Sequence, residues 1–351
     1  MLNTKIGFNN NANDVINSND LRKRILNIDS RFRSNYKDPS TNFSFQLEHA
    51  YKNIIRLRVA SIEIPNMSYV FSNIKSNTSF IIKAYDITGV PREALISIPD
   101  GNYISQEIIN IIQESLNTNF KTPYGIFITI SLNTNTGKIT FTHNGVSNYP
   151  VASSIITPIQ SAKPFILDFL TNTNFKNRQH NFGLGYNLGF RQKSYKTTIS
   201  STITPLTTYS ITSEGCIDVV GDTYMFLSIN DLHTVEQKTN TNYLQCLAKI
   251  IIREEKYCVI YDDGGTLLSN EIIFPSPVDL RMLNIQLLDP YGDVIDICDM
   301  NFSFSLEITE VLNTRLYDFY RNYIWLGSIP SVPKNVKGSA QPLLNGIGPP
   351  F

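Results

Sequence analysis

The sequence is short of charge, and the charge that it has is balanced. Thirty Lys and Arg side chains match thirty Asp and Glu side chains, and charged residues make up 17% of the 351 positions. An average globular domain has about 25%. A protein whose main work is to coat nucleic acid needs a basic face that displaces counterions from phosphates, so this balance argues against specific nucleic-acid binding. A neutral surface also removes the like-charge repulsion that opposes dense self-association.

Long apolar runs are also missing. No run approaches the roughly 18 apolar residues that a membrane-spanning helix needs. The N-terminal stretch MLNTKIGFNNNAND lacks the apolar core of a secretion signal. We therefore expect no transmembrane segment and synthesis in a cytosol-like compartment.

The four cysteines do not form a metal or redox motif. Cys216, Cys246, Cys258 and Cys298 include no Cys-x-x-Cys pair, so a zinc site is not indicated. Cys258 and Cys298 lie in apolar, strand-like runs, and Cys216 begins another. We expect buried thiols in a reducing compartment.

Catalytic motifs are absent as well. The histidines are widely spaced and fit no metal-binding pattern; they are His49, His143, His180 and His233. In FGLGYNLGF at residues 182–190 the last glycine spacing is too long for a dinucleotide loop and no helix is expected after it. We interpret this run as a bulge or a close approach of strands. The adjacent carboxylates of YDDGGT at 261–266 favour a turn over a cation site. The sequence therefore predicts no enzyme, no cofactor and no metal.

What the sequence does have is alternation of apolar and polar residues. In NFSFQL at residues 42–47 every second side chain is apolar, and IIRLRVASIEI at 54–64 alternates in the same way until Pro65. The run at 125–143 contains two alternating stretches around Gly137 and predicts a hairpin. Many short strands with regular turns predict an all-β fold, an antiparallel jelly-roll β-sandwich with one inserted helix and extended terminal arms.

One stretch has helical spacing instead. In ISQEIINIIQESLN at residues 104–117, isoleucines and a leucine recur every three or four positions, as on the buried face of a helix. We expect Ile104, Ile108, either Ile111 or Ile112, and Leu116 on that face. Ser105 is the expected N-cap, and Glu107 suits the positive end of the helix dipole.

Both ends of the chain differ from the patterned middle. Residues 1–26 are polar and predict a flexible arm; its basic cluster, Arg22, Lys23 and Arg24, is either solvated or in contact with an acidic neighbour or a membrane surface. Residues 311–351 predict a helix followed by a Pro- and Gly-rich segment, which is either a docked arm or a disordered tail. For the docked arm, the predicted interface residues are Phe319, Tyr320, Tyr323, Trp325, Ile329, Leu343, Leu344 and Phe351.

Residues 27–310 lie between these ends and form either a single elaborated roll or two joined rolls with a boundary near 190–195. The hexamer NFSFQL at 42–47 returns as NFSFSL at 301–306. The residues after each hexamer do not repeat, so duplication is not indicated. In a jelly roll the first and last strands are antiparallel neighbours, and we predict that the hexamers pair. Their expected core-facing residues are Phe43, Phe45, Leu47, Phe302, Phe304 and Leu306.

A series of segments, in order, resembles the jelly-roll minor capsid and penton-type proteins of large icosahedral nucleocytoplasmic DNA viruses. The segments are NIDSRFRSNYKDPSTNFSFQLEHAYKNIIRLRVASIEIPNMSYVFS, IPDGNYISQEIINIIQESLN, TGKITFTH, LGF at 188–190, GDTYMFLSINDL at 221–232, and LRMLNIQLLDPYGDVIDICDMNFSFSLEI. Together they span about residues 27–310. Related segments occur in penton-like proteins of polinton-type elements and small satellite viruses.

The resemblance implies a structural capsid protein without catalysis, located in the virion shell and assembled in the host cytoplasm or a virus factory. It implies contacts with the major capsid protein and with other minor capsid proteins. It also implies a homo-oligomer, a pentamer or a trimer, close to an inner viral membrane but without a membrane-spanning segment. A penton and a cement position in the shell both stay open.

Two other classes also stay open. A β-sandwich module that binds glycans or a receptor on the virion would need an exposed aromatic platform near loops. An enzyme on the same scaffold would need paired carboxylates or a metal cluster assembled from distant residues.

Overall fold

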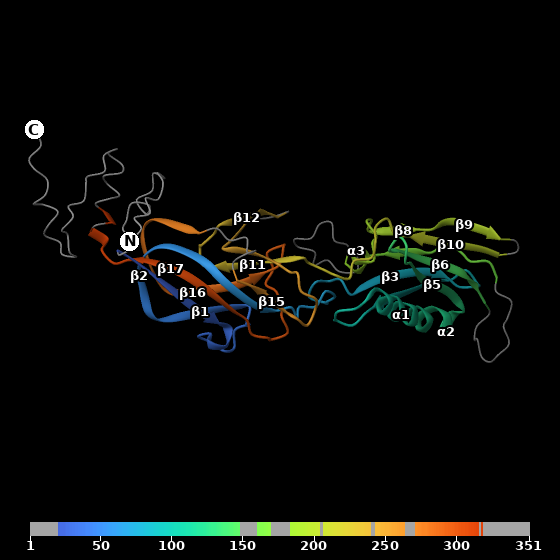
Figure 1. The fold of residues 1–351 in the computed structure, drawn as a ribbon. Helices are drawn as coiled ribbons and strands as arrows, with labels where there is room; N and C mark the ends of the chain where they lie inside the picture. Colours follow the sequence, from blue (N-terminus) through green and yellow to red (C-terminus); the bar gives the residue numbers. More distant parts are fainter. Residues whose placement is uncertain are drawn as a thin grey trace, which may run out of the picture.

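The protein consists of two lobes arranged end to end (Figure 1). The computed structural model describes residues 20–147, 160–169, 183–203, 206–239, 243–263, 271–315 and 317–318. We call the described residues of 20–66 and 222–318 the basal lobe, and those of 70–219 the distal lobe. Each lobe buries its own apolar cluster, so the chain is stabilised by two main cores.

The basal lobe is built on a seven-stranded antiparallel sheet with the order β1-β17-β2-β16-β11-β14, and β15 joins the end of β2. Its strands are β1 (Leu21–Asp29), β2 (Asn42–Pro65), β11 (Tyr224–Ile229), β14 (Ala248–Ile251), β15 (Val259–Asp262), β16 (Ile272–Leu288) and β17 (Ser303–Val311). A two-stranded sheet, β12 (Val235–Lys238) with β13 (Tyr243–Cys246), packs beside β11. Because successive side chains of a strand point to opposite faces, one face of each strand supplies the core.

Strand β2 curls across the basal lobe (Figure 1). Its first part pairs with β16 and its last part with β17, where Ile62 lies opposite Phe304. In a straight strand, residues 43 and 62 would be about 60 Å apart at 3.3 Å per residue. The rings of Phe43 and Phe302 nevertheless have centroids only 6.1 Å apart. The sheet therefore folds over on itself, and Asn53, with a φ of +57°, lies between the two parts of β2.

The two hexamers are thus neighbours across the core but not strand partners. Residues 42–46 pair with 282–286 of β16, whereas 303–306 pair with β1 on one side and with the second part of β2 on the other. The predicted pairing is wrong because β2 continues past residue 47 as one strand, and its second part takes the place beside β17. The predicted core faces are confirmed: Phe43, Leu47, Phe302, Phe304 and Leu306 are buried, and Phe45 packs partly buried against the same core.

Residues 21–26 belong to β1, so the predicted flexible arm ends too late at residue 26. β1 pairs with β17 along its nine residues. Arg22 and Arg24 lie 2.8 and 3.2 Å from the Glu310 carboxylate, and Lys23 Nζ lies 2.8 Å from Glu307. The basic cluster is therefore not a solvated tail, and its acidic neighbours are side chains of β17 in the same chain.

The distal lobe is a sandwich of two four-stranded antiparallel sheets, β4-β3-β7-β8 and β5-β6-β10-β9. Their strands are β3 (Ser79–Tyr85), β4 (Pro91–Ser97), β5 (Ile126–Asn133), β6 (Lys138–Val146), β7 (Ile166–Asp168), β8 (Ser194–Lys196), β9 (Thr198–Ile203) and β10 (Leu206–Thr212). Phe80 of β3 contacts Phe141 of β6 with ring centroids 5.7 Å apart, so the sheets face each other across the core. The predicted hairpin is confirmed as β5 and β6, joined through Gly137.

Helix α1 (Ser105–Leu116) covers one side of the distal lobe and packs against β4 and β5. Its buried side chains are Ile108, Ile109, Ile112 and Leu116. The helix begins one residue earlier than predicted, because Ile104 and not Ser105 occupies the N-cap position. Ile104 is 64% exposed, and its N–H donates to the Glu107 carboxylate at 3.0 Å. The short segments η4 (Asn117–Lys121) and α2 (Thr122–Tyr124) then lead into β5.

The predicted all-β class is confirmed, with curled antiparallel sheets consistent with a jelly-roll sandwich and with α1 as the inserted helix. The chain passes between the lobes near residues 66–70 and again near 219–224. Leu188 and Ile211 lie on either side of 190–195 and belong to the same distal core, so the two cores do not divide there. Whether 27–310 counts as one roll or two stays a prediction. Within the described ranges, no helix has the length and apolar character of a membrane span.

Candidate functional site

The lobes meet at a waist where motif segments of the sequence converge. In IPDGNY, the Asn102 side chain accepts a hydrogen bond from the Val70 N–H at 2.8 Å. The Asp100 carboxylate accepts bonds from Ser72 Oγ at 3.1 Å and from the Asn73 N–H at 3.0 Å. Gly101 pairs with Phe71 through two backbone bonds. This segment therefore fixes the first crossing between the lobes.

The second crossing lies against the first. Gly221 opens the segment GDTY with a φ of +78°, and a Cβ placed there would lie 3.1 Å from the Val70 methyl groups. A side chain at this position would meet both backbone strain and Val70. The two crossings are thus in contact, and the chain leaves the basal lobe and returns to it at one place.

A third motif segment forms the basal side of the waist. In DPYGDVID at 289–296, Asp289 Oδ1 accepts bonds from the N–H groups of Tyr291 and Asp293 at 2.8 and 3.0 Å. The Asp296 carboxylate accepts from the Cys298 N–H at 2.8 Å. These bonds hold a turn that carries three carboxylates toward the same region.

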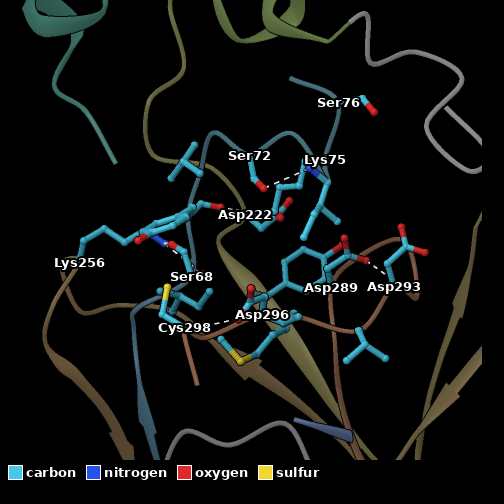
Figure 2. A pocket seen from close by; sticks show the side chains of 18 residues that line it. Ser68, Ser72, Lys75, Ser76, Asp222, Lys256, Asp289, Asp293, Asp296 and Cys298 are labelled. Atoms are coloured by element: carbon cyan, nitrogen blue, oxygen red, sulfur yellow. Dashed lines mark hydrogen bonds between the residues drawn. The ribbon is translucent and has the colours of Figure 1, made fainter. Parts of the chain in front are cut away.

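A cavity of about 490 Å³ opens at the waist. Its walls come from residues 68–76, from Asp222, Tyr224 and Met225, from Ile252 and Lys256, and from residues 289–298. Figure 2 shows Lys256 and Ser68 on one side of the cavity and Asp289 and Asp293 on the other, with Asp222 between them. The walls combine apolar side chains, tyrosine rings and four carboxylates.

Lys256 is the most perturbed cation of the cavity. Its Nζ donates to Ser68 O at 2.8 Å, and to Ser68 Oγ and Asn66 Oδ1 at 3.2 Å. Burial, together with the nearby Lys75, lowers the pKa of Lys256 to about 8, against the opposing effects of Asp222 and Cys298. The amine therefore serves as a tie between the 254–258 loop and the first crossing, and its hydrogen bonds go to neutral oxygen atoms.

Tyr69 and Cys298 lie together at the edge of the cavity. The neighbouring Cys298 thiol holds the pKa of Tyr69 above its usual value, with smaller contributions from Tyr257 and Asp296. Cys298 Sγ also donates to Met67 O at 3.3 Å. The backbone of Cys298 has a φ of +56°, which places this thiol on a turn rather than inside a strand.

The expectation of buried thiols is wrong for three of the four cysteines. Cys246 is buried, but Cys216, Cys258 and Cys298 are exposed. Cys258 precedes β15, and its carbonyl accepts from the Asn66 N–H at 2.8 Å. These three cysteines lie where apolar runs of the sequence meet turns, and at such positions the thiol is exposed rather than part of the core.

The charges on the walls of the cavity indicate which kind of ligand could enter it. In the parts of the chain that the structure describes, no group of three His, Cys, Asp or Glu side chains is arranged to hold a metal ion. The protons of Lys256 are directed at three oxygen acceptors. Carboxylates outnumber lysines along the walls, so an extended peptide or a cationic ligand fits the electrostatics better than an anion does.

The interface residues predicted from the sequence are not tested by the structure. Phe319, Tyr320, Tyr323, Trp325, Ile329, Leu343, Leu344 and Phe351 all lie outside the described residues. The chain leading to them is fixed as far as Tyr317, whose buried ring packs with Ile55, Val311 and Leu21. The helix and extended arm predicted for 311–351 are described only as far as residue 318, so the arm stays a prediction.

The other residues considered from the sequence have structural surroundings. His143 is fully buried; its Nδ1 lies 2.8 Å from Lys163 O, and burial lowers its pKa. His180 and the glycines of YDDGGT lie outside the described residues. The glycine-rich run is not the predicted bulge or approach of strands, because residues 184–187 form a short helix. The backbone is nevertheless closely packed there, since a Cβ on Gly185 would lie 2.3 Å from Phe169 Cγ.

The sequence did not predict the waist cavity. Its walls combine residues more than 200 positions apart, such as Tyr69 and Asp296. A local sequence pattern does not predict that residues so far apart in the chain come together. The available signal was the presence of turn motifs, IPDGNY and DPYGD, whose side chains bind backbone N–H groups.

Comparisons with known proteins give a likeness to a solved structure, but no match of sequence family. No protein-family model matches the sequence, and no curated protein matches it. Among solved structures, the chain is similar to the crystal structure of a mavirus penton protein, with a TM-score of 0.42 and 11% sequence identity. The match covers 83% of this chain and 99% of that chain. A likeness this distant assigns neither a family nor a function.

Proposed function

We propose that the protein is a structural component of an icosahedral virus capsid, a minor capsid or penton-type protein without catalytic activity. The observation that carries this proposal is the use made of the motif residues. Asp100, Asn102 and Asp289 bind backbone N–H groups that fix the waist, and Arg33 holds the carbonyls of Ser30 and Asp38. Polar side chains that bind the backbone in this way stabilise the fold, which is a structural role. The resemblance of the same segments to viral capsid proteins supplies the class.

The partners follow from this class. The protein packs against the major capsid protein, other minor capsid proteins and further copies of itself, as a pentamer or a trimer in the virion shell. Assembly takes place in the host cytoplasm or a virus factory, next to an inner viral membrane. The segment from residue 319 onward is the proposed arm that joins neighbours, because it is rich in Pro and Gly and carries isolated apolar anchors, as extended recognition segments do.

A truncation after residue 318 tests this function. The buried Tyr317 is retained, so we expect the truncated protein to fold with an unchanged melting temperature. It should fail to enter particles when it is expressed with the other shell proteins, whereas the full chain enters them. Absence of the full chain from purified particles would contradict the capsid function, and normal incorporation of the truncated chain would contradict the arm.

Native mass measurement of the full chain tests the oligomer. A pentamer supports a vertex position and a trimer supports a place beneath the capsomers. A strict monomer at the concentrations of assembly would contradict the proposed self-association.

A further inference from the structure

The waist cavity continues outward as a row of exposed aromatic and apolar side chains. Tyr69 lines the cavity and is 40% exposed. Tyr257 is close enough to act on the pKa of Tyr69. Two and four residues further on, Val259 and Tyr261 are exposed on β15, while Ile260 between them is buried. We call these four residues, Tyr69, Tyr257, Val259 and Tyr261, the tyrosine row.

The strand that carries this row is at an edge of the sheet. In the described part of the chain β15 pairs only with β2, through residues 62–65. No described strand pairs with its other side, and an added extended segment at that side could bond to the strand backbone while its side chains contact the row. The tyrosine row therefore lies along an edge that can receive a peptide.

The cavity beside the row is acidic. Asp222, Asp289, Asp293 and Asp296 line it, against Lys75 and Lys256. Lys256 is held by Ser68 and Asn66, so its amine is turned toward the protein. A ligand that enters from the row meets aromatic rings first and carboxylates next.

This order of surfaces matches one kind of ligand. A proline-rich segment adopts a polyproline II helix before it binds, so little conformational entropy is lost, and it docks on aromatic-lined grooves. Lysines beside the prolines would reach the carboxylates of the cavity. The chain contains such a segment: IPSVPKNVKG at residues 329–338 has the pattern Pro-x-x-Pro followed by Lys334 and Lys337. From residue 319 to 351 the sequence has three basic and no acidic side chains.

Chain length favours a segment from a neighbouring copy. Tyr317 packs against Ile55, and β2 rises about 33 Å between Ile55 and Pro65, next to the waist, at 3.3 Å per residue. The dozen residues from 318 to 330 reach at most about 40 Å when fully extended. A segment bound to its own copy would have to run almost straight, whereas one from a neighbour has no such constraint.

We propose that the waist cavity and the tyrosine row bind residues 329–338 of a second copy of this chain. The proposal rests on the proposed function, since it names the receptor for the arm that joins subunits. The prolines lie on the tyrosine row, and Lys334 and Lys337 pair with carboxylates of the cavity.

Crosslinking between isotope-labelled copies tests the proposal. Full chains with a photoreactive amino acid in place of Val332 are prepared in light and heavy-nitrogen forms, mixed at equal amounts, and irradiated. We expect crosslinks from position 332 to residues 68–75 or 256–261, with light–heavy pairs as frequent as chance mixing allows. Crosslinks confined to one isotope would show binding within one copy and would overturn the proposal.

Crosslinks between copies at another surface would also overturn the waist as receptor, while the proposed joining arm would stand. No crosslink between copies, together with a monomeric native mass, would overturn both. The two proposals can therefore fail separately.

Substitutions give a second readout on the same full chains. Lys334→Glu and Tyr257→Ser should each reduce the light–heavy crosslink yield about two- to fivefold, the range for the loss of one exposed contact. Mixing Lys334→Glu chains with Asp222→Lys chains should restore the yield between the two kinds of chain. The matched controls are Tyr36→Ser and Asp231→Lys, both at exposed positions of the basal lobe outside the cavity. Equal losses in the controls and the test variants would refute binding at the waist.

Discussion

The close approach of Gly185 to Phe169 leads to a prediction about the glycine-rich run. Gly185 lies in the short helix α3 (Leu184–Asn187). An alanine Cβ there would lie 2.3 Å from Phe169 Cγ and 2.4 Å from Cδ1, more than an ångström inside ordinary carbon–carbon contact of about 3.5 Å. Phe169 cannot retreat freely, because its ring stacks on Phe190 at 5.0 Å and contacts Phe80 at 5.5 Å.

The magnitude follows from these contacts. Overpacking a filled core costs about 1–3 kcal/mol, and a clash against a wedged ring belongs at the upper end of that range. Replacing glycine by alanine in a helix returns roughly 0.5–1 kcal/mol through backbone entropy. We therefore expect Gly185→Ala to lower the free energy of unfolding by about 2 kcal/mol, which corresponds to a fall of about 4–8 °C in Tm for a unit of this size.

Differential scanning calorimetry of the full chain measures this change. Gly101→Ala is the matched control, because its Cβ would lie no closer than 3.2 Å to Tyr103, a contact that a shift of a few tenths of an ångström relieves. A fall in Tm below about 1 °C for Gly185→Ala, or an equal fall for Gly101→Ala, would refute the packing role of the run.

Three further predictions concern the basal lobe and the waist. The pKa of Lys256 is about 8 in the folded chain, so between pH 8 and 10.5 the unfolded chain binds more protons than the folded chain and the free energy of unfolding rises with pH. Lys256→Met should reduce this rise by about 1–2 kcal/mol after allowance for solvent screening. Urea unfolding of both proteins at pH 7.5 and 10 measures the rise, and an equal rise in both would contradict the prediction. Glu310→Gln should lower the free energy of unfolding by about 1–2 kcal/mol, because a buried carboxylate that accepts from Arg22 and forms an ion pair with Arg24 is replaced by a weaker, neutral acceptor. A loss below about 0.3 kcal/mol in urea would argue against stabilisation of β1 by this carboxylate. At Asn53, with its positive φ, Asn53→Val should cost about 1–2 kcal/mol and Asn53→Gly almost nothing, and similar chemical-denaturation midpoints for the two variants would contradict strain at this position.

The sequence predicted which side chains are buried better than which strands pair. Alternation in NFSFQL and NFSFSL identified the core faces because burial depends on local period. Strand pairing depends on where β2 bends, which is at Asn53, the residue with a positive φ. An asparagine is as common in a turn between two strands as in a bend within one, so its identity does not distinguish the two. The sequence therefore suggested two strands, at 42–47 and 54–64, where the structure has one.

Charge and end effects were harder to predict for a similar reason. Arg22, Lys23 and Arg24 resembled a tail because their partners, Glu307 and Glu310, lie more than 280 positions later. The Ser105 N-cap prediction failed for a local reason: the helix begins one residue earlier, with Ile104 at the N-cap position and its N–H bonded to the Glu107 carboxylate. For the basic cluster, distance in sequence rather than residue type set the limit of prediction.

The contact between the two crossings at Val70 and Gly221 also has a consequence for the order of folding. All strand pairings of the distal lobe join residues within 79–212, whereas β2 must wait for β16 and β17, more than 200 positions away. Loop closure over such distances is slow, so the distal lobe is complete while the apolar face of β2 still lacks its partners. Once formed, the distal lobe holds residues 70 and 221 together and shortens the effective loop that the basal sheet has to close. The lobe farther from both described ends of the chain thus acts as the clamp on which the other lobe assembles.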